Sequence, residues 1–337
     1  MAPLISVTTQ DNVAAIRQMA GLATPMALRV AVTLGLPDRL REPATADHLA
    51  TELEASPVGL ELLLSHLTTL GILDSTDEGF HTTDFGETLC TDAGNGLTNF
   101  LHLDMAGGRS EMAFVELRHS VTTGEPGYAR HFGADFWTDL DRNRDLREQF
   151  DQQMVQRFQQ TLPPIVANYD WGRFASIVDV GGGNGTVLAA ILDANEKTTG
   201  KVVELEPTAA AANKRFAERG LDSRAEAVEG SFFDPLPAGA QAYLLADILH
   251  DWDDDHAHRI LARCAEAAAP DGRVLILEAV RGRMSTTAFD LAMFVIFAGR
   301  ERRVEEFETL AAAHGLALVT VTDVSDERCL LEFRRVS

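Results

Sequence analysis

A glycine-rich loop near the middle of the chain has the composition of a ligand-binding turn. Residues 179–185 have the sequence DVGGGNG, after an apolar segment and before a helical one. The bare backbone at Gly181 and Gly183 can approach a ligand closely, and the helix that follows offers amide donors to a carboxylate. A tight strand-to-helix turn without any ligand uses the same glycines. The loop alone therefore predicts only a nucleotide-like ligand.

Polar and aromatic residues farther along the chain narrow the nature of that ligand. Glu204, in the segment KVVELE, follows the loop by about 20 residues, where a carboxylate accepts hydrogen bonds from both hydroxyls of a ribose. Ser231 and Phe232, in GSFFDPLP, follow the next predicted strand. They are candidates for the edge and the plane of an adenine, with a core position as the alternative for Phe232. These spacings favour a cofactor that contains a ribose.

His250 is the candidate for acid–base chemistry. It stands in ADILHDWDDD, after the fourth predicted strand, and open α/β sheets bind ligands at the carboxyl ends of their strands. Its imidazole can take the proton of a phenol, whose intrinsic pKa is near 10, as a methyl group is transferred in line. Glu278 in LILEAV and Glu301 in AGRERR are two candidates for orienting the ring. A purely structural histidine is the alternative.

Together these segments resemble a family of S-adenosylmethionine-dependent small-molecule O-methyltransferases, found in plant phenylpropanoid and actinobacterial antibiotic pathways. The likeness rests on DVGGGNG, GSFFDPLP, LHDWDD, LILEAV and FDLAMFVIFAGRERRVEEF, and it covers essentially the whole chain. It implies S-adenosylmethionine as the cofactor, no metal ion, His250 as the general base, and Glu278 and Glu301 beside it. The predicted cofactor contacts are Asp179, Gly181, Gly183, Glu204, Ser231, Phe232 and Asp247.

The same resemblance has two departures and one implication for assembly. The family often has aspartate at the place of Ser231 and a basic or polar cofactor contact at the place of Ala246, so the adenine side departs from the family pattern. The family members form homodimers through their N-terminal domains, whose helices reach over the partner's active site. A homodimer is therefore expected here.

A narrower likeness points to the acceptor. The segments IRQMAGLATPMALRVAVTLGL, ARHFGADFWTDL and EGSFFDPLPAGA resemble bacterial methyltransferases that act on hydroxylated naphthoic and related aryl acids. It implies that Arg17 binds the substrate carboxylate through a two-point fork, although Arg17 can equally be a solvated helix residue. Residues expected to line an aromatic pocket, or else to belong to the core, are Phe136, Trp137, Phe150, Met154, Met293 and Phe297.

The C-terminal half has the pattern of a parallel sheet that could position these residues. From Ser176 onward, the apolar segments SIVDV, KVVELE, AYLLAD and RVLILEAV alternate with helical stretches. Two late strands, LALVTVTDV and CLLEFRRV, are separated by a short polar turn and should pair antiparallel. The fold class is therefore α/β, a Rossmann-like methyltransferase sheet with a C-terminal antiparallel hairpin, over residues 169–337.

The pattern of the N-terminal part, residues 1–100, predicts a helical domain with a winged helix, and the family resemblance implies that this is the dimerisation domain. Apolar spacing from Asp11 to Leu36 suggests two helices that meet at a kink, with Pro25 and Gly35 as breaks. Further helices follow Thr45 and Ser56, and a hairpin spans 72–82. Residues 101–168 form a helical connector that contributes to the substrate pocket. It includes a helix over 145–160.

Composition limits the possible partners and reactions. The 337-residue chain has 51 acidic and 29 basic residues and a formal charge of −22, which opposes binding to nucleic acid and to anionic membranes. A DNA-binding regulator is thus a remote alternative for the winged helix. The three cysteines have no metal-type spacing, and the sequence contains neither a secretory leader nor a membrane span, so a cytoplasmic location is expected. C- or N-methylation, hydroxylation and decarboxylation on the same fold remain alternative reactions.

Overall fold

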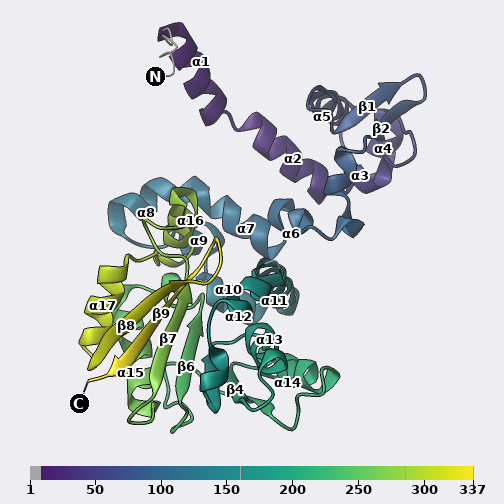
Figure 1. Ribbon diagram of the computed structural model, residues 1–337. Helices are drawn as coiled ribbons and strands as arrows, with labels where there is room; N and C mark the ends of the chain where they lie inside the picture. Colours follow the sequence, from purple (N-terminus) through teal and green to yellow (C-terminus); the bar gives the residue numbers. More distant parts are fainter. Residues whose placement is uncertain (1–8, 160, 285, 337) are drawn as a thin grey trace, which may run out of the picture. The chain divides into compact units, whose positions relative to one another are not determined.

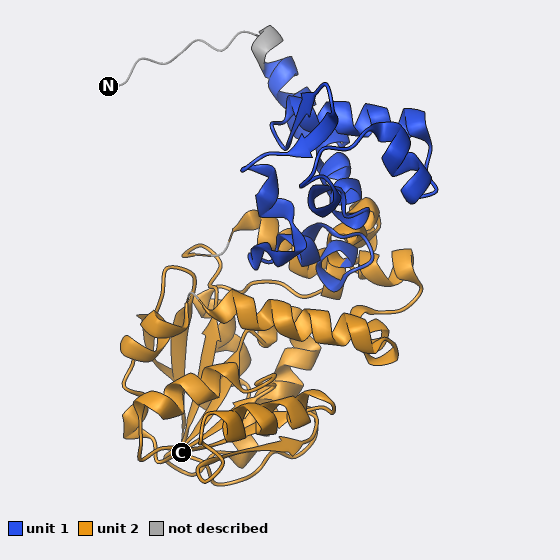
Figure 2. Ribbon diagram, turned by 90° about the vertical axis from the view of Figure 1, so that its right-hand side faces the viewer, with its two compact units in different colours: residues 1–109 blue, residues 110–337 orange. Residues whose placement is uncertain are grey.

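The computed structural model describes residues 9–159, 161–284 and 286–336 (Figure 1). The chain divides into two compact units, Met1–Arg109 and Ser110–Ser337 (Figure 2). Each unit has its own buried apolar core. The finer division at residues 100 and 168 stays a prediction. Within the described ranges, no helix has both the length and the apolar character required to cross a membrane.

Unit 1 begins with the two expected helices, α1 (Thr9–Ala20) and α2 (Ala23–Thr33). The break between them lies at Gly21 and Leu22, ahead of Pro25, because a proline in the first turn of a helix has no amide partner to lose. This unit also contains the short helix α3 (Leu36–Arg39), helix α6 (Leu97–Leu101) and two 3-10 turns, Gly86–Leu89 and Thr91–Ala93.

The winged-helix part of unit 1 follows the capping signals in the sequence. The Thr45 hydroxyl accepts the His48 amide at 3.3 Å at the start of α4 (Ala46–Glu52), and Ser56 caps α5 (Pro57–Thr69) by accepting the Gly59 amide at 3.2 Å. Strands β1 (Leu73–Thr76) and β2 (Gly79–Thr82) pair antiparallel, as expected. Helix, turn, helix and hairpin are therefore all present.

Helices dominate the first part of unit 2 and the segment leading into it. The expected helix over 145–160 is α11 (Arg144–Gln159), and Gln160 lies outside the described residues. The other helices of this stretch are α7 (Ala106–Met112), α8 (Leu117–Thr123), α9 (Gly127–Phe132), α10 (Phe136–Arg142) and α12 (Leu162–Ala167).

A seven-stranded sheet, in the order β5-β4-β3-β6-β7-β9-β8, forms the centre of unit 2. The first five strands are parallel, and β9 pairs antiparallel with both β7 and β8, which confirms the predicted hairpin. The strands are β3 (Ser176–Val180), β4 (Thr199–Glu204), β5 (Ala225–Glu229), β6 (Ala242–Ala246), β7 (Arg273–Glu278), β8 (Leu316–Asp323) and β9 (Cys329–Arg335).

Helices cover both faces of this sheet because alternate strand residues point to opposite faces. Val178 packs in the core under α15 (Asp254–Ala267) and α17 (Val304–Ala312), whereas Ile177 packs under α13 (Thr186–Ala194) (Figure 1). Helix α14 (Thr208–Glu218) packs in the same core as Ile177 and α13. Helix α16 (Thr287–Phe297) follows β7 in the chain and precedes α17. Strand order reverses at β3, between β4 and β6, where ligands of open α/β sheets bind.

Candidate active site

The glycine loop between β3 and α13 adopts a backbone that other residues rarely adopt. Gly181, Gly183 and Gly185 have φ angles of 72°, 56° and 75°, in the left-handed region. A Cβ on Gly181 would lie 2.7 Å from the Ile248 Cδ1, so packing also demands glycine there. A Cβ on Gly183 would meet nothing within 4 Å, which leaves open space beside this residue. The two predicted glycines thus differ: one permits close packing and the other borders free space.

Two carboxylates lie at this loop. Glu204, at the end of β4, accepts the Gly183 amide at 3.0 Å and the Leu205 amide at 2.8 Å. Asp179 is fully buried, and neither of its oxygens has a well-formed hydrogen bond within the described part of the chain. Burial, and then the charge of Glu204, raise the pKa of Asp179 to about 7. A buried carboxylate with unused acceptor capacity is suited to a cationic group of a ligand.

The predicted adenine contacts lie next to the same loop. If Gly181 carried a Cβ, this atom would lie 3.2 Å from the Phe232 ring. The Phe232 ring also meets the Trp252 ring edge-on, with centroids 5.8 Å apart. The Ser231 hydroxyl accepts the Phe233 amide at 3.2 Å and keeps its own proton to donate. Both side chains are half-buried.

Asp247 follows β6 with a φ of 51°, an uncommon value for a residue with a side chain. Its carboxylate is held by Arg328 through two short contacts, Nε to Oδ1 at 3.0 Å and Nη2 to Oδ2 at 2.6 Å. The Arg157 Nε lies 3.6 Å from the same carboxylate. Burial opposes the charge, but the two guanidinium groups outweigh it and hold the pKa of Asp247 well below its usual range. Asp247 is therefore an ionised, arginine-bound group.

Arg157 is a functional candidate that the sequence interpretation missed. Its guanidinium stacks on the Phe289 ring at 4.5 Å, and that ring lies 5.7 Å from the His250 ring. The side chain is 26% exposed, so the guanidinium can still receive an anionic partner. A helical spacing could have revealed it, because Phe150, Met154 and Arg157 fall at i, i+4 and i+7 of α11, on one face.

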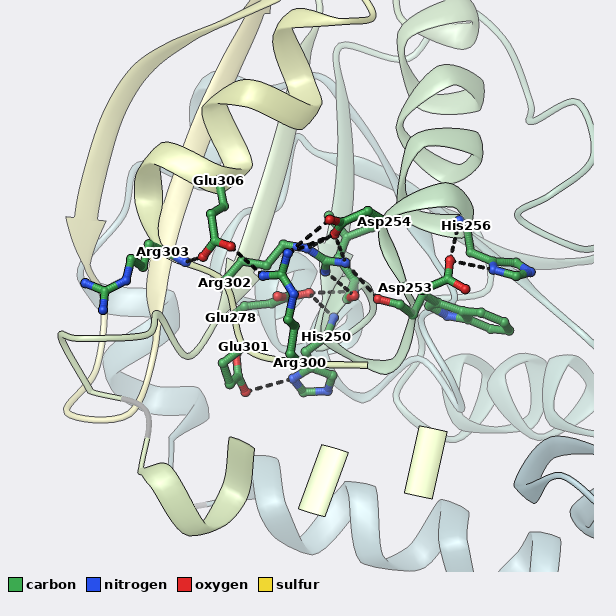
Figure 3. A network of polar contacts seen from close by, with 12 residues as sticks. His250, Asp253, Asp254, His256, Glu278, Arg300, Glu301, Arg302, Arg303 and Glu306 are labelled. Carbon is green, nitrogen blue, oxygen red and sulfur yellow. Dashed lines mark hydrogen bonds and ion pairs between the residues drawn. The ribbon is translucent and has the colours of Figure 1, made fainter. Parts of the chain in front are cut away.

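Two separate carboxylates hold His250, which lies in a short 3-10 turn, Leu249–Asp251, after β6 (Figure 3). The ring Nδ1 is 3.0 Å from Glu301 Oε1, so Glu301 fixes the ring. Glu278 Oε1 instead accepts the backbone amides of Leu249 at 2.5 Å and of His250 at 3.2 Å. The two expected carboxylates therefore make different contacts: Glu301 bonds the imidazole, and Glu278 bonds the backbone of the turn that carries it.

The second ring nitrogen of His250 has a carboxylate beside it as well. Nε2 lies 3.4 Å from Asp251 Oδ1, and the imidazole is only 3% exposed. Burial disfavours the charged ring, but Asp251, Glu301 and then Glu278 outweigh it and raise the pKa of His250 to about 10. Burial raises the pKa of Asp251 to about 6, against the lowering effect of His250. The three acids therefore favour the protonated form of the imidazole.

The same three groups are close enough to be considered as metal ligands. One ligand atom from each of His250, Glu278 and Glu301 lies within 4.8 Å of the others. The His250 nitrogen that meets Glu301 is already in a hydrogen bond, and Glu278 Oε1 already accepts two amides. The other oxygen of each carboxylate, Glu278 Oε2 and Glu301 Oε2, has no hydrogen-bond partner among the described residues. The contacts of Nδ1 and of Glu278 Oε1 orient the imidazole and its turn.

Aromatic rings gather near this turn. Trp137 stacks on Trp252 with centroids 6.1 Å apart and on Phe297 at 5.3 Å. Phe136 and Phe150 meet the same cluster edge-on. Four of the predicted pocket residues are thus brought together, and Trp252 is an additional member that the sequence interpretation did not include.

The remaining predicted acceptor contacts, Met154, Met293 and Arg17, are not members of this cluster of aromatic rings. Met293 is buried in α16, and Met154 is half-buried in α11. Arg17 lies in the last turn of α1, in unit 1, with an exposed side chain. Its assignment to a substrate carboxylate stays a prediction.

Comparisons with known proteins match nearly the whole chain. Residues 114–317 match the O-methyltransferase domain, and residues 16–92 match the O-methyltransferase dimerisation domain. The chain is 44% identical, over 92% of its length and 94% of the relative, to 2,7-dihydroxy-5-methyl-1-naphthoate 7-O-methyltransferase of Streptomyces carzinostaticus. It is 36% identical to aclacinomycin 10-hydroxylase RdmB of Streptomyces purpurascens, over 98% of this chain and 92% of that protein.

A solved structure resembles this chain equally well. It is the O-methyltransferase NcsB1 from neocarzinostatin biosynthesis, in complex with S-adenosylmethionine and 2-hydroxy-5-methyl naphthoic acid. The TM-score is 0.89 at 42% identity, over 95% of this chain and 98% of that one. Fold and sequence therefore agree in the family that they indicate.

Proposed function

Because this chain belongs to the S-adenosylmethionine-dependent O-methyltransferases, we propose that it methylates a hydroxyl of a small aromatic acid, of the hydroxynaphthoate or hydroxybenzoate type. We assign the product to secondary metabolism, in antibiotic biosynthesis. The observation that carries the proposal is the His250–Glu301 pair, an oriented imidazole at the carboxyl end of β6. The relative named for a dihydroxy-naphthoate supports the acceptor class.

The residues at the glycine loop fit the cofactor. S-adenosylmethionine supplies a methyl group on a positively charged sulfur. The unpartnered Asp179 carboxylate suits its ammonium group, Glu204 suits the ribose hydroxyls, and Arg157 suits a carboxylate. We assign Ser231 and Phe232 to the adenine. We also assign Asp247, whose carboxylate is bound by Arg328, to the cofactor side of the site. These assignments are proposals that cofactor-binding measurements can test.

His250 acts as the general base in this proposal. Its Nε2 takes the proton of the acceptor hydroxyl, while Glu301 holds Nδ1 and so fixes the ring and its tautomer. Glu278 keeps the turn in place through two amides. The surrounding acids favour the protonated imidazole of His250. A nearby positive charge is therefore needed to lower the pKa of His250, so that the neutral ring can accept a proton. Bound cofactor provides such a charge.

The acceptor would be held by flat aromatic surfaces and by a charge. Trp137 and Phe297 offer stacking faces for a planar ring, and Phe150, Met154 and Met293 are the further lining residues that we assign to it. Arg17 is assigned to the substrate carboxylate, on the strength of the family likeness. If so, the carboxylate is part of what the enzyme recognises.

The remaining assignments concern assembly and location. The dimerisation-domain match supports a homodimer formed through the N-terminal domain. Three buried free cysteines are consistent with a cytoplasmic protein. No metal, nucleic acid or membrane takes part in the proposed reaction, and the charge of −22 opposes binding to polyanions.

The function can be tested with labelled cofactor and a panel of hydroxynaphthoates, hydroxybenzoates and their methyl esters. We expect acids to gain one methyl group while S-adenosylhomocysteine forms in equal amount. Arg17→Ala should raise the KM for acids and leave the KM for esters unchanged. Esters that react as well as acids would overturn the assignment of Arg17.

A second chemistry has a specific observation behind it. The 36% identical relative is named as a hydroxylase, so this fold also accommodates a reaction other than O-methylation. C- or N-methylation and decarboxylation belong to the same set of alternatives. Product mass separates them: an acceptor that changes while the cofactor stays unaltered contradicts methyl transfer.

A further inference from the structure

The segment between α16 and α17, Ala298–Arg303, closes around the turn that carries His250. Ala298 ends α16 with a φ of 61°, and Gly299 then passes directly over the turn. A Cβ on Gly299 would lie 2.1 Å from the His250 carbonyl oxygen and 2.7 Å from the Asp251 carbonyl carbon. Only a residue without a side chain can approach this closely. The two backbones are therefore fitted to each other at the site of the base.

Arg302, in the same segment, binds the turn from its carbonyl side (Figure 3). Its Nη1 donates to the Leu249 carbonyl at 2.6 Å, and its Nη2 donates to the Trp252 carbonyl at 2.7 Å. The guanidinium also pairs with Asp254 Oδ1, the first residue of α15, at 2.9 and 3.1 Å. The side chain is fully buried. A planar fork is required to reach these acceptors together, and a lysine ammonium lacks that geometry.

The contacts of Arg302 complement those of Glu278. Glu278 accepts the amides of Leu249 and His250, and Arg302 donates to carbonyls on either side of His250. Glu301, the residue before Arg302, bonds the ring itself. Backbone and ring of the base are thus held by neighbouring residues of one segment, and a shift of Arg302 would move both.

We propose that Arg302 is a positioning residue of the methyl-transfer reaction, which holds His250 in its reactive place through the carbonyls that flank it. The proposal rests on the proposed function of His250 as the base. A buried guanidinium that only stabilised the fold would affect folding and cofactor affinity together. A positioning residue affects the rate of the chemical step, because a misplacement of about 1 Å can cost about 100-fold in rate.

The test compares Arg302→Lys and Arg302→Met with the matched control Arg300→Lys. Arg300 also pairs with Asp254, at 3.0 Å, and with Glu306, at 2.6 Å, but it is partly exposed, and among the described residues it contacts these two carboxylates rather than the turn carbonyls. We expect kcat to fall about 100-fold in both Arg302 variants, with unchanged cofactor Kd, and to stay within about 2-fold in the control. The charge is retained in Arg302→Lys, so the midpoint of its kcat–pH profile should not move. Full activity of Arg302→Lys would overturn the proposal.

A double-mutant cycle separates positioning from general destabilisation. In a His250→Ala background, Arg302→Lys should have no further effect on kcat, because the group that it positions is gone. An additional large loss there would contradict the proposal. Guanidinium added at low concentration should restore part of the rate to Arg302→Met, provided His250 is present. If Arg302→Met does not fold, Arg302→Lys and its cycle still decide the question. Near-normal activity of His250→Ala alone would instead contradict the function proposed for the base.

Discussion

The two halves of the site in unit 2 are built in different ways. At the ends of β3 and β4, the edge that we assign to the cofactor (the cofactor edge) contains a glycine turn of fixed backbone shape, with Asp179 before it and Glu204 on the neighbouring strand. At the end of β6, the edge that we assign to catalysis (the catalytic edge) depends on side chains from distant segments: His250 meets Glu301, 51 residues later, and Glu278 lies on β7. The glycine turn has its shape from its own backbone, whereas the catalytic edge is assembled by tertiary contacts.

This difference has a functional consequence. A backbone turn followed by a helix recognises the common parts of a cofactor, and it needs few side chains to do so. A base must have both a place and a pKa, and each is set by charged neighbours. We therefore expect changes at the cofactor edge to alter cofactor affinity and changes at the catalytic edge to alter kcat. The following experiments test that separation.

The largest effect is expected from Glu301→Gln. The amide keeps the size of the side chain, but it removes the charge that stabilises the protonated ring and leaves only a neutral amide oxygen as the acceptor for Nδ1. We expect kcat to fall by about 100-fold, with a cofactor Kd close to that of the wild type. Steady-state rates and calorimetric cofactor binding measure the two quantities. A weakened Kd with normal kcat would show that the two edges are not separate.

A smaller effect, of the opposite kind, is expected from Glu204→Ala. The loss of a charged acceptor for the ribose should raise the cofactor Kd by about 10- to 100-fold, since hydrogen bonds to charged groups contribute about 1.5–3 kcal/mol. At saturating cofactor, kcat should remain within about 2-fold. A kcat that stays low at saturation would place Glu204 in the chemical step.

The smallest effect is expected from Asp251→Asn, which should shift the pH dependence of the rate. Burial opposes the charged imidazole, but Asp251 is the foremost of the acids that raise the pKa of His250 to about 10. The base must be neutral, so the rate falls as pH drops through this pKa. Removing the Asp251 charge lowers the pKa, and the acid limb of kcat/KM against pH should move to lower pH. The exposed acid Asp255 of the same helix region provides the control, and Asp255→Asn should leave the limb unmoved.

Much of the fold follows from local signals in the sequence. The alternation of apolar segments predicts the parallel strands, and hydroxyl caps at Thr45 and Ser56 predict two helix starts. The glycine spacing predicts the loop because glycine adopts the positive φ angles of this turn more readily than other residues. The break between the first two helices was harder to locate, since Pro25 is tolerated in a first helical turn and Gly21 is not marked by any cap.

For the catalytic edge, the sequence named candidate residues by their type but did not predict their contacts. The sequence could not distinguish the function of Glu278 from that of Glu301, because both stand after apolar strands or helices and only packing decides which reaches the ring. Arg302 and Asp251 were missed for the same reason: their partners are backbone carbonyls and a ring nitrogen, which leave no spacing in the sequence. Such contacts appear only once the sheet is assembled.

The most direct test of His250 as the base is the single-turnover rate of methyl transfer in His250→Gln, with cofactor and a hydroxynaphthoate both saturating. Glu204→Ala is measured under the same conditions. We expect a rate at least about 100-fold below the wild type for His250→Gln, with normal cofactor affinity, and a near-normal rate for Glu204→Ala. A wild-type single-turnover rate in His250→Gln would contradict the assignment of His250 as the base.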